Sequence, residues 1–178
     1  GGYADVSITG GEIDVSVEGS GVAIGGNAGG SINIQGNAIK SISSRNGACI
    51  GGSTKNITIL DAELPFLGSE GILIGNEVGD NTGGDLTIRN CRILSTDIAA
   101  RGGIQVGNNG KIQIENSEIM LSRAKGIRTG DGGSITIRDS QLVTNGIYMV
   151  EEGTTQRKLK RLEQPARTVV TSDALGSK

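Results

Sequence analysis

The chain has 178 residues, the size of one domain, and only 35% of them are hydrophobic and 2% aromatic. Its 31 glycines lack the three-residue period of collagen and accompany regularly spaced apolar residues, which excludes both a triple helix and a disordered chain. The net charge of −2 gives no bias toward nucleic acid, and no apolar run is long enough to span a membrane. We therefore expect neither a nucleic-acid partner nor membrane insertion.

A pattern of one polar residue between two apolar residues recurs along the chain. Its copies are Val6-Ser7-Ile8, Ile32-Asn33-Ile34, Ile57-Thr58-Ile59, Leu86-Thr87-Ile88, Ile112-Gln113-Ile114 and Ile135-Thr136-Ile137. Consecutive copies start 23 to 29 residues apart, a period that is typical of solenoids. The alternation predicts a short strand in each copy, with its apolar side chains inward and its polar side chain outward.

Each copy is followed by a tight corner and then by a second predicted strand. The corner residue is always one that tolerates a left-handed backbone: Gly10, Gly36, Asp61, Asn90, Asn116 or Asp139. An apolar residue stands seven positions after the start of every copy: Ile13, Ile39, Leu64, Ile93, Ile119 and Leu142. The residues just before it are predicted to form a solvated column of mixed charge, namely Glu12, Glu63, Arg92, Glu118 and Gln141.

Glycines frame a third stretch in each coil, as in Gly21-Val22-Ala23-Ile24-Gly25-Gly26 and Gly103-Ile104-Gln105-Val106-Gly107. The stretch predicts a third strand. Its outward residues are expected to be Ala23, Cys49, Leu73, Gln105 and Arg128.

These stretches predict an all-β fold in which residues 1–148 form a single parallel β-helix with three walls and about six coils of about 26 residues. A β-sandwich would not explain the constant seven-residue offset. After Met149 the repeat ends, and residues 149–171 are predicted to be a C-terminal cap, with a short amphipathic helix over residues 154–165 and a possible strand over residues 166–171. Residues 172–178 are expected to be a tail. The chain starts within the repeat pattern, so we expect it to be part of a larger polypeptide.

The residues available for chemistry argue against an enzyme. There is no histidine, which excludes His-based catalysis and His metal ligands. Cys49 and Cys91 are expected two coils apart on different walls, too far for a disulfide. Glu63 and Glu118 are expected on one wall, and we interpret them as part of the solvated column more readily than as a catalytic pair.

An insertion around residues 76–84 lengthens one corner, and loops of this kind often carry binding sites. Phe66, beside Pro65, either stacks against a sugar ring or fills a gap in the packing. The candidate ligand-binding residues are Phe66, Asn76, Glu77, Asp80, Asn81 and Gln105. A tolerated polar bulge is the alternative for the insertion.

Two glycine-rich acidic loops make calcium the one candidate ion, with Asp80, Asp85 and Asp131 as ligands. The chain lacks the strict short period of calcium-binding nonapeptide repeats, so no cofactor is expected beyond this weak candidate. Near the C-terminus, Arg157, Lys158, Lys160 and Arg161 are either a solvated face or a surface for an acidic partner.

The units "GVAIGG", "GACIGG" and "GILIG", together with the "NITI" and "SITI" strands, resemble the Gly-rich right-handed β-helix repeats of large bacterial surface proteins. The resemblance covers residues 4 to about 148. It implies a right-handed coil, an extracellular or cell-surface location, and an adhesin-type, carbohydrate-interacting role. Pectate-lyase-like enzymes share the coil, but their paired Asp residues, Gly-His-Gly turn and Arg-x-Lys pair have no counterpart here.

We therefore expect a non-catalytic, secreted β-helical module that binds a glycan or a host surface protein. Three alternatives stay open: a structural stalk or spacer of a larger protein, a polysaccharide-active enzyme that uses carboxylates, and a protein–protein docking surface.

Overall fold

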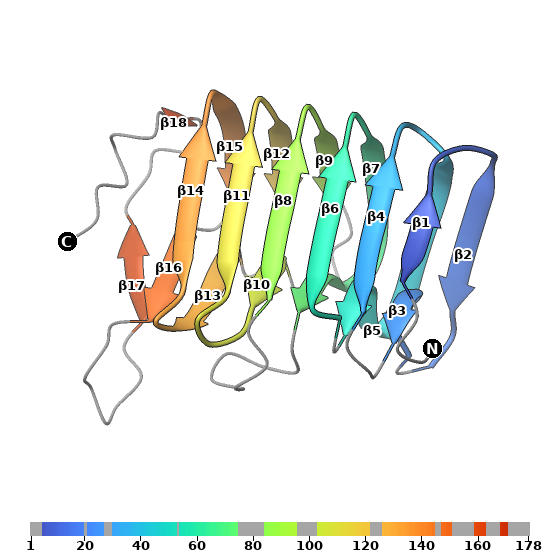
Figure 1. Ribbon diagram of the computed structural model, residues 1–178, viewed down its shortest axis with the longest axis horizontal. Helices are drawn as coiled ribbons and strands as arrows, with labels where there is room; N and C mark the ends of the chain where they lie inside the picture. The colour runs from blue at the N-terminus through green and yellow to red at the C-terminus, as the bar shows by residue number, and fades with distance from the viewer. Residues whose placement is uncertain are drawn as a thin grey trace.

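The protein forms a rod of stacked β-strands in a computed structural model (Figure 1). The structure describes residues 5–19, 21–26, 30–52, 54–74, 84–95, 103–121, 126–144, 147–150, 159–162 and 168–170. Throughout these residues the structure is strand, turn, bend or irregular, with no helix. Strands β1 to β3 lie at one end of the rod, and β17 and β18 lie at the other.

The first wall is a six-stranded parallel sheet whose strands stack in chain order. Its register pairs the predicted copies residue for residue, for example Ile32 with Ile57 and Asn33 with Thr58. The prediction of these strands and of their inward and outward positions is confirmed. The strands are β1 (Val6–Ile8), β4 (Ser31–Gln35), β6 (Asn56–Leu60), β8 (Asp85–Arg89), β11 (Lys111–Glu115) and β14 (Ser134–Arg138).

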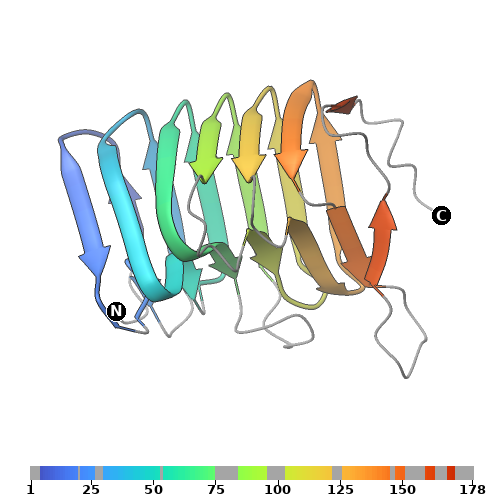
Figure 2. The same ribbon diagram turned by 180° about the vertical axis from the view of Figure 1, so that it is seen from behind.

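The second and third walls belong to one twelve-stranded sheet, visible from behind in Figure 2. They are joined because β5 (Ile39–Gly52) and β7 (Glu63–Ile74) run through both walls. The second wall also contains β2 (Ile13–Val17), β9 (Arg92–Ser95), β12 (Glu118–Leu121) and β15 (Ser140–Thr144). The third wall also contains β3 (Ile24–Gly26), β10 (Ile104–Val106), β13 (Ile127–Asp131) and β16 (Ile147–Val150).

The core is a narrow column of aliphatic side chains enclosed by the three walls. Ile34, Ile59, Ile88 and Ile114 stack along the first wall with no exposed surface. Burial of such a column supplies the main driving force for folding, which explains how a chain with few apolar residues sustains a fold.

The third wall differs from the sequence expectation in its first two coils. Ile24 pairs with Ile50, and Ile50 with Ile72, so Gly25 and Gly51 occupy the outward position that continues as Leu73, Gln105 and Arg128. Cys49, which was expected to face outward, is fully buried. The expectation was wrong because stacked isoleucines, and not the framing glycines, set the register. A Cβ at Gly25 would collide with the carbonyl oxygen of Gly51, so the close approach of these coils requires glycine here.

The corners between the first and second walls adopt the predicted left-handed backbone. The φ angles of Asp61, Asn90, Asn116 and Asp139 lie between 45° and 53°. Gly36 has a φ of 74°, whereas in the first coil the left-handed residue is Gly11 and not Gly10.

The described residues of the C-terminal cap form strands. Residues 159–162, within the predicted helix, form β17 (Leu159–Leu162), which pairs antiparallel with β16. The predicted last strand is confirmed as β18 (Thr168–Val170), which pairs antiparallel with β15. For residues 159–162 the helix prediction was wrong, because β16 presents N–H and C=O groups along its edge and a strand satisfies them where a helix would not. The rest of the predicted helix, residues 154–158 and 163–165, lies outside the described residues.

Candidate functional site

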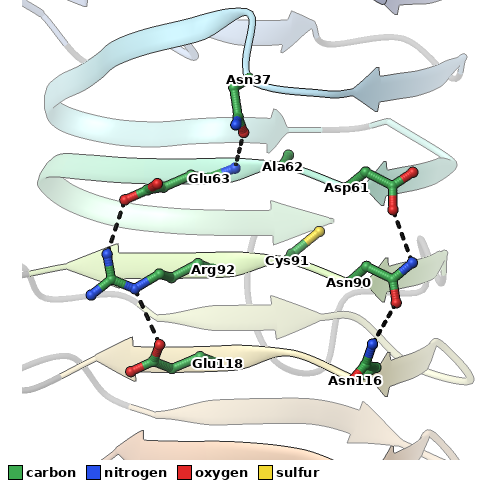
Figure 3. Close-up of a pocket in the computed structure, with 9 residues that line it drawn as sticks. All are labelled: Asn37, Asp61, Ala62, Glu63, Asn90, Cys91, Arg92, Asn116 and Glu118. Carbon is green, nitrogen blue, oxygen red and sulfur yellow. Dashed lines mark hydrogen bonds and ion pairs between the residues drawn. The ribbon is translucent and has the colours of Figure 1, made fainter.

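A shallow groove of about 420 Å³ follows the corner between the first and second walls (Figure 3). We call it the corner groove. The same repeat positions of successive coils line it, because parallel pairing places equivalent residues of neighbouring coils about 4.8 Å apart. Its lining residues are Asn37, Asp61, Ala62, Glu63, Asn90, Cys91, Arg92, Asn116 and Glu118.

One side of the corner groove is a ladder of corner side chains (Figure 3). The Nδ2 of Asn90 donates to Asp61 Oδ1 at 2.9 Å, and the Nδ2 of Asn116 donates to Asn90 Oδ1 at 2.8 Å. A carboxamide carries two N–H donors and an oxygen with two lone pairs, so the bonds within the ladder use only part of the capacity of Asn90. The ladder therefore presents a row of polar groups with donors and acceptors left for solvent or a ligand.

The other side is a charged ladder on the second wall. Arg92 bonds Glu63 Oε1 through one terminal nitrogen at 3.0 Å and Glu118 Oε2 through Nε at 3.1 Å. Their side chains are 49%, 51% and 43% exposed, which confirms the predicted solvated column of mixed charge. The hydrogen bonds from Arg92 to Glu118 and to Glu63 raise the pKa of its guanidinium, so this cation stays charged.

Small buried residues lie between the two ladders: Ala62 and Cys91 line the corner groove, and Ser117 and Ser140 continue their column in the next two coils. Ser117 Oγ donates to the Glu115 carbonyl at 2.7 Å and accepts the Cys91 N–H at 3.0 Å, and Ser140 repeats this geometry one coil further. Cys91 occupies the equivalent position, and its Sγ lies 3.0 Å from the Arg89 carbonyl. Burial raises the pKa of the Cys91 thiol, which keeps it protonated and a poor nucleophile.

The predicted ligand-binding residues do not gather at one place among the described residues. Gln105 is half-buried on β10 of the third wall, between Leu73 and Arg128, away from the corner groove. The backbone of Phe66 lies in β7, paired with Ile42 and Ser95, and its side chain is outside the description. Asn76, Glu77, Asp80 and Asn81 lie outside the described residues.

The calcium and partner candidates are likewise dispersed. Asp85 begins β8 on the first wall and Asp131 ends β13 on the third, and both are exposed, while Asp80 is outside the described residues. Within the described ranges, no three Asp, Glu, Cys or His residues are grouped so that they could hold a metal ion. Lys160 and Arg161 lie in β17, and Arg157 and Lys158 are outside the description.

The sequence predicted Asp61, Asn90 and Asn116 as corner residues, but it did not predict that their side chains form a hydrogen-bonded surface. The available signal was the recurrence of Asp or Asn at one repeat offset in consecutive coils. Left-handed geometry alone accounts for Gly, Asn or Asp, whereas only the side-chain amides and carboxylate build the ladder.

Comparison with known proteins gives a match at the level of the fold. The family model for the right-handed β-helix region matches residues 5–158. Searches of the curated proteins and of the solved structures returned no significant match. Within the described residues, no helix is long and apolar enough to cross a membrane.

Proposed function

Because the chain belongs to the right-handed β-helix family, we propose that it is a non-catalytic binding module whose ligand, a surface glycan, lies in the corner groove. The proposal includes an extracellular or cell-surface location and an adhesin-type role. The observation that carries it is the pair of parallel polar ladders, Asp61–Asn90–Asn116 and Glu63–Arg92–Glu118, at matching repeat positions along one groove.

The chemistry of the two ladders suits a polyhydroxyl ligand. Sugar hydroxyls donate and accept hydrogen bonds, and the corner groove offers carboxylates as acceptors, a guanidinium as donor and carboxamides as both. Polar side chains follow one another at the coil spacing of about 4.8 Å, so an extended chain along the rod meets a polar group at each coil. The charged side chains are about half exposed, so a ligand displaces water from them without burying an unpaired charge.

Two features support a non-catalytic role. Glu63 and Glu118 are held on either side of Arg92, whereas glycoside hydrolysis needs two carboxyl groups that face each other across the substrate. The Cys91 thiol, with its raised pKa, is a poor nucleophile.

A glycan array followed by titration calorimetry tests the proposal. Asn90→Gly removes the central amide of the ladder and keeps a residue that tolerates a φ of 53°. We expect the affinity for the array-selected glycan to fall about tenfold, the effect of losing about 1.4 kcal/mol of hydrogen bonding.

Gln113→Ala is the matched control, because Gln113 is an exposed polar residue on the first wall, outside the corner groove. It should bind as the unmodified protein does. Unchanged binding by Asn90→Gly, or release of reducing ends from any polysaccharide, would contradict the proposal.

A structural spacer is the second candidate, and the inter-coil bonds themselves favour it. Asn90 and Arg92 each connect three successive coils, as expected of ladders that stiffen a rod. In that case no array glycan binds, and Asn90→Gly changes only the melting temperature.

A further inference from the structure

The outer face of the second wall carries a stripe of apolar side chains. Each of these residues directly follows a buried core residue of its strand, so its side chain points outward. Parallel pairing places them at one register position in four successive coils, and all four are half-buried. The apolar stripe consists of Pro65, Leu94, Met120 and Val143.

The fold itself does not require apolar residues at an outward position. In the first two coils of the second wall, the same register position holds Asp14 and Ser41, which are hydrogen-bonded to each other. The outward column of the first wall is polar in every coil: Ser7, Asn33, Thr58, Thr87, Gln113 and Thr136. An apolar surface confined to one face of a rod marks an interaction site.

A two-fold axis parallel to the strands, between β9 and β12, brings two copies together with stripe against stripe. The rods are then antiparallel, β9 faces the partner's β12, and β7 faces the partner's β15. Leu94 lies against the partner's Met120. Pro65 likewise lies against the partner's Val143, so every residue of the apolar stripe meets another apolar residue. An axis one coil nearer to β7 would instead place Met120 on the partner's Ser41.

The same axis brings opposite charges of the charged ladder together. Arg92 lies against the partner's Glu118, and the symmetry repeats this pair. Glu63 lies against the partner's Gln141, which is uncharged. An axis through β9 would oppose the two Arg92 side chains, and an axis through β12 would oppose the two Glu118 side chains. The bonds of Arg92 to Glu63 and Glu118 within one copy use two of the five N–H donors of a guanidinium. Charge complementarity therefore selects the same register as the apolar stripe.

We propose that the second wall is a self-association surface on which two copies pack antiparallel, as an isologous dimer. The four strands span about 14 Å along the rod, which is small beside the roughly 800 Å² per partner of a stable interface. We therefore expect a weak, reversible dimer. The partner copy covers the charged ladder that the proposed glycan also uses, so glycan and partner compete. The inference does not rest on the proposed function, because the dimer forms without glycan.

Sedimentation equilibrium of the purified chain, without glycan and at concentrations up to about 1 mM, tests the proposal. We expect the average mass to rise from the monomer toward the dimer and no further. Leu94→Thr with Met120→Thr should abolish the rise, whereas Gln113→Thr, at the outward position of the first wall, should leave it unchanged. A monomer at every concentration, or undiminished association of the double variant, would overturn the proposal.

Two charge reversals test the register. Arg92→Glu and Glu118→Arg should each associate about tenfold more weakly, because each dimer then opposes two pairs of like charges. An equimolar mixture of the two variants should regain association, because the mixed dimer restores both pairs of opposite charge.

Arg89→Glu is the matched control, since Arg89 is also an arginine bonded to a glutamate of the next coil, but on the first wall. It should associate like the unmodified chain. A mixture that stays monomeric, or equal weakening by the control, would overturn the antiparallel register. Circular dichroism melting of every variant establishes that the rod is folded.

Discussion

The effect of a single residue on the stability of this rod depends on which side of a wall its side chain faces. Thr129 shows the cost of a polar group on the inner side. It is fully buried, and its Oγ1 has no hydrogen-bond partner among the described residues. Val106 holds the corresponding position in the preceding coil, because Arg128 pairs with Gln105 and Thr129 and Val106 each come next in the chain. Val106 is a buried aliphatic residue.

We therefore expect Thr129→Val to stabilise the protein by about 1 kcal/mol, because it removes an unsatisfied hydroxyl without changing the shape of the side chain. Chemical denaturation measures the change. A loss of stability would show that the hydroxyl is satisfied in solution.

The buried thiol of Cys49 makes the free energy of unfolding depend on pH. Burial raises the pKa of its thiol from 9.0 to about 12. The folded state thus favours the neutral thiol, so its contribution to stability is complete below pH 9 and is lost as the pH rises toward 12. We expect the free energy of unfolding to fall by up to about 1.4 kcal/mol per pH unit in this window.

Cys49→Ala is the control for this titration, because lysines and tyrosines also titrate at high pH. Its stability should decline less steeply than that of the unmodified chain between pH 9 and 12. Equal slopes would show that the thiol is not shielded from solvent.

At the scale of strands, the alternation of the first wall assigns each residue to the core or to solvent. Ile34→Asp should cost about 3–5 kcal/mol because it buries an unpaired carboxylate, and Ile114→Asp should do the same. Ser7→Asp and Thr136→Asp lie at outward positions and should change stability by less than about 0.5 kcal/mol. Circular dichroism melting compares the four variants, and the reverse order would mean that the wall faces the other way.

The first wall could be predicted from sequence because each of its strands has a single apolar–polar–apolar arrangement and a constant offset to the next apolar residue. The third wall was ambiguous in its first two coils. "GVAIGG" and "GACIGG" permit two alignments, and only the stacking of Ile24, Ile50 and Ile72 selects between them. The cap strand β17 was missed because Leu159 and Leu162 also fit a helix, and pairing with β16 is a tertiary effect that local sequence does not encode.

The candidate site was predicted less well than the fold. The charged ladder followed from the column of residues before the constant apolar position. The amide ladder was not foreseen, because it depends on parallel coils that bring Asp61, Asn90 and Asn116 into hydrogen-bond contact. Sequence spacing gives the repeat, whereas the distances between side chains come from the stacking of the coils.

At the scale of the whole molecule, one regular coil places core, corner and surface residues in parallel lines along the rod. The corner groove is such a line, and it is hollowed and bordered by two bonded polar ladders. The first wall carries one such ladder, in which Glu115 is paired with Arg89 and Arg138. We propose that a glycan lies along this line.

NMR titration of the ¹⁵N-labelled protein with a panel of neutral oligosaccharides tests this claim most directly, because asparagine side-chain NH₂ groups give separate signals. We expect the signals of Asn90 and Asn116 to shift on addition of the bound oligosaccharide, while those of Asn33 and Asn56 on the first wall stay in place. Shifts confined to the first wall, or no shift with any member of the panel, would contradict the claim.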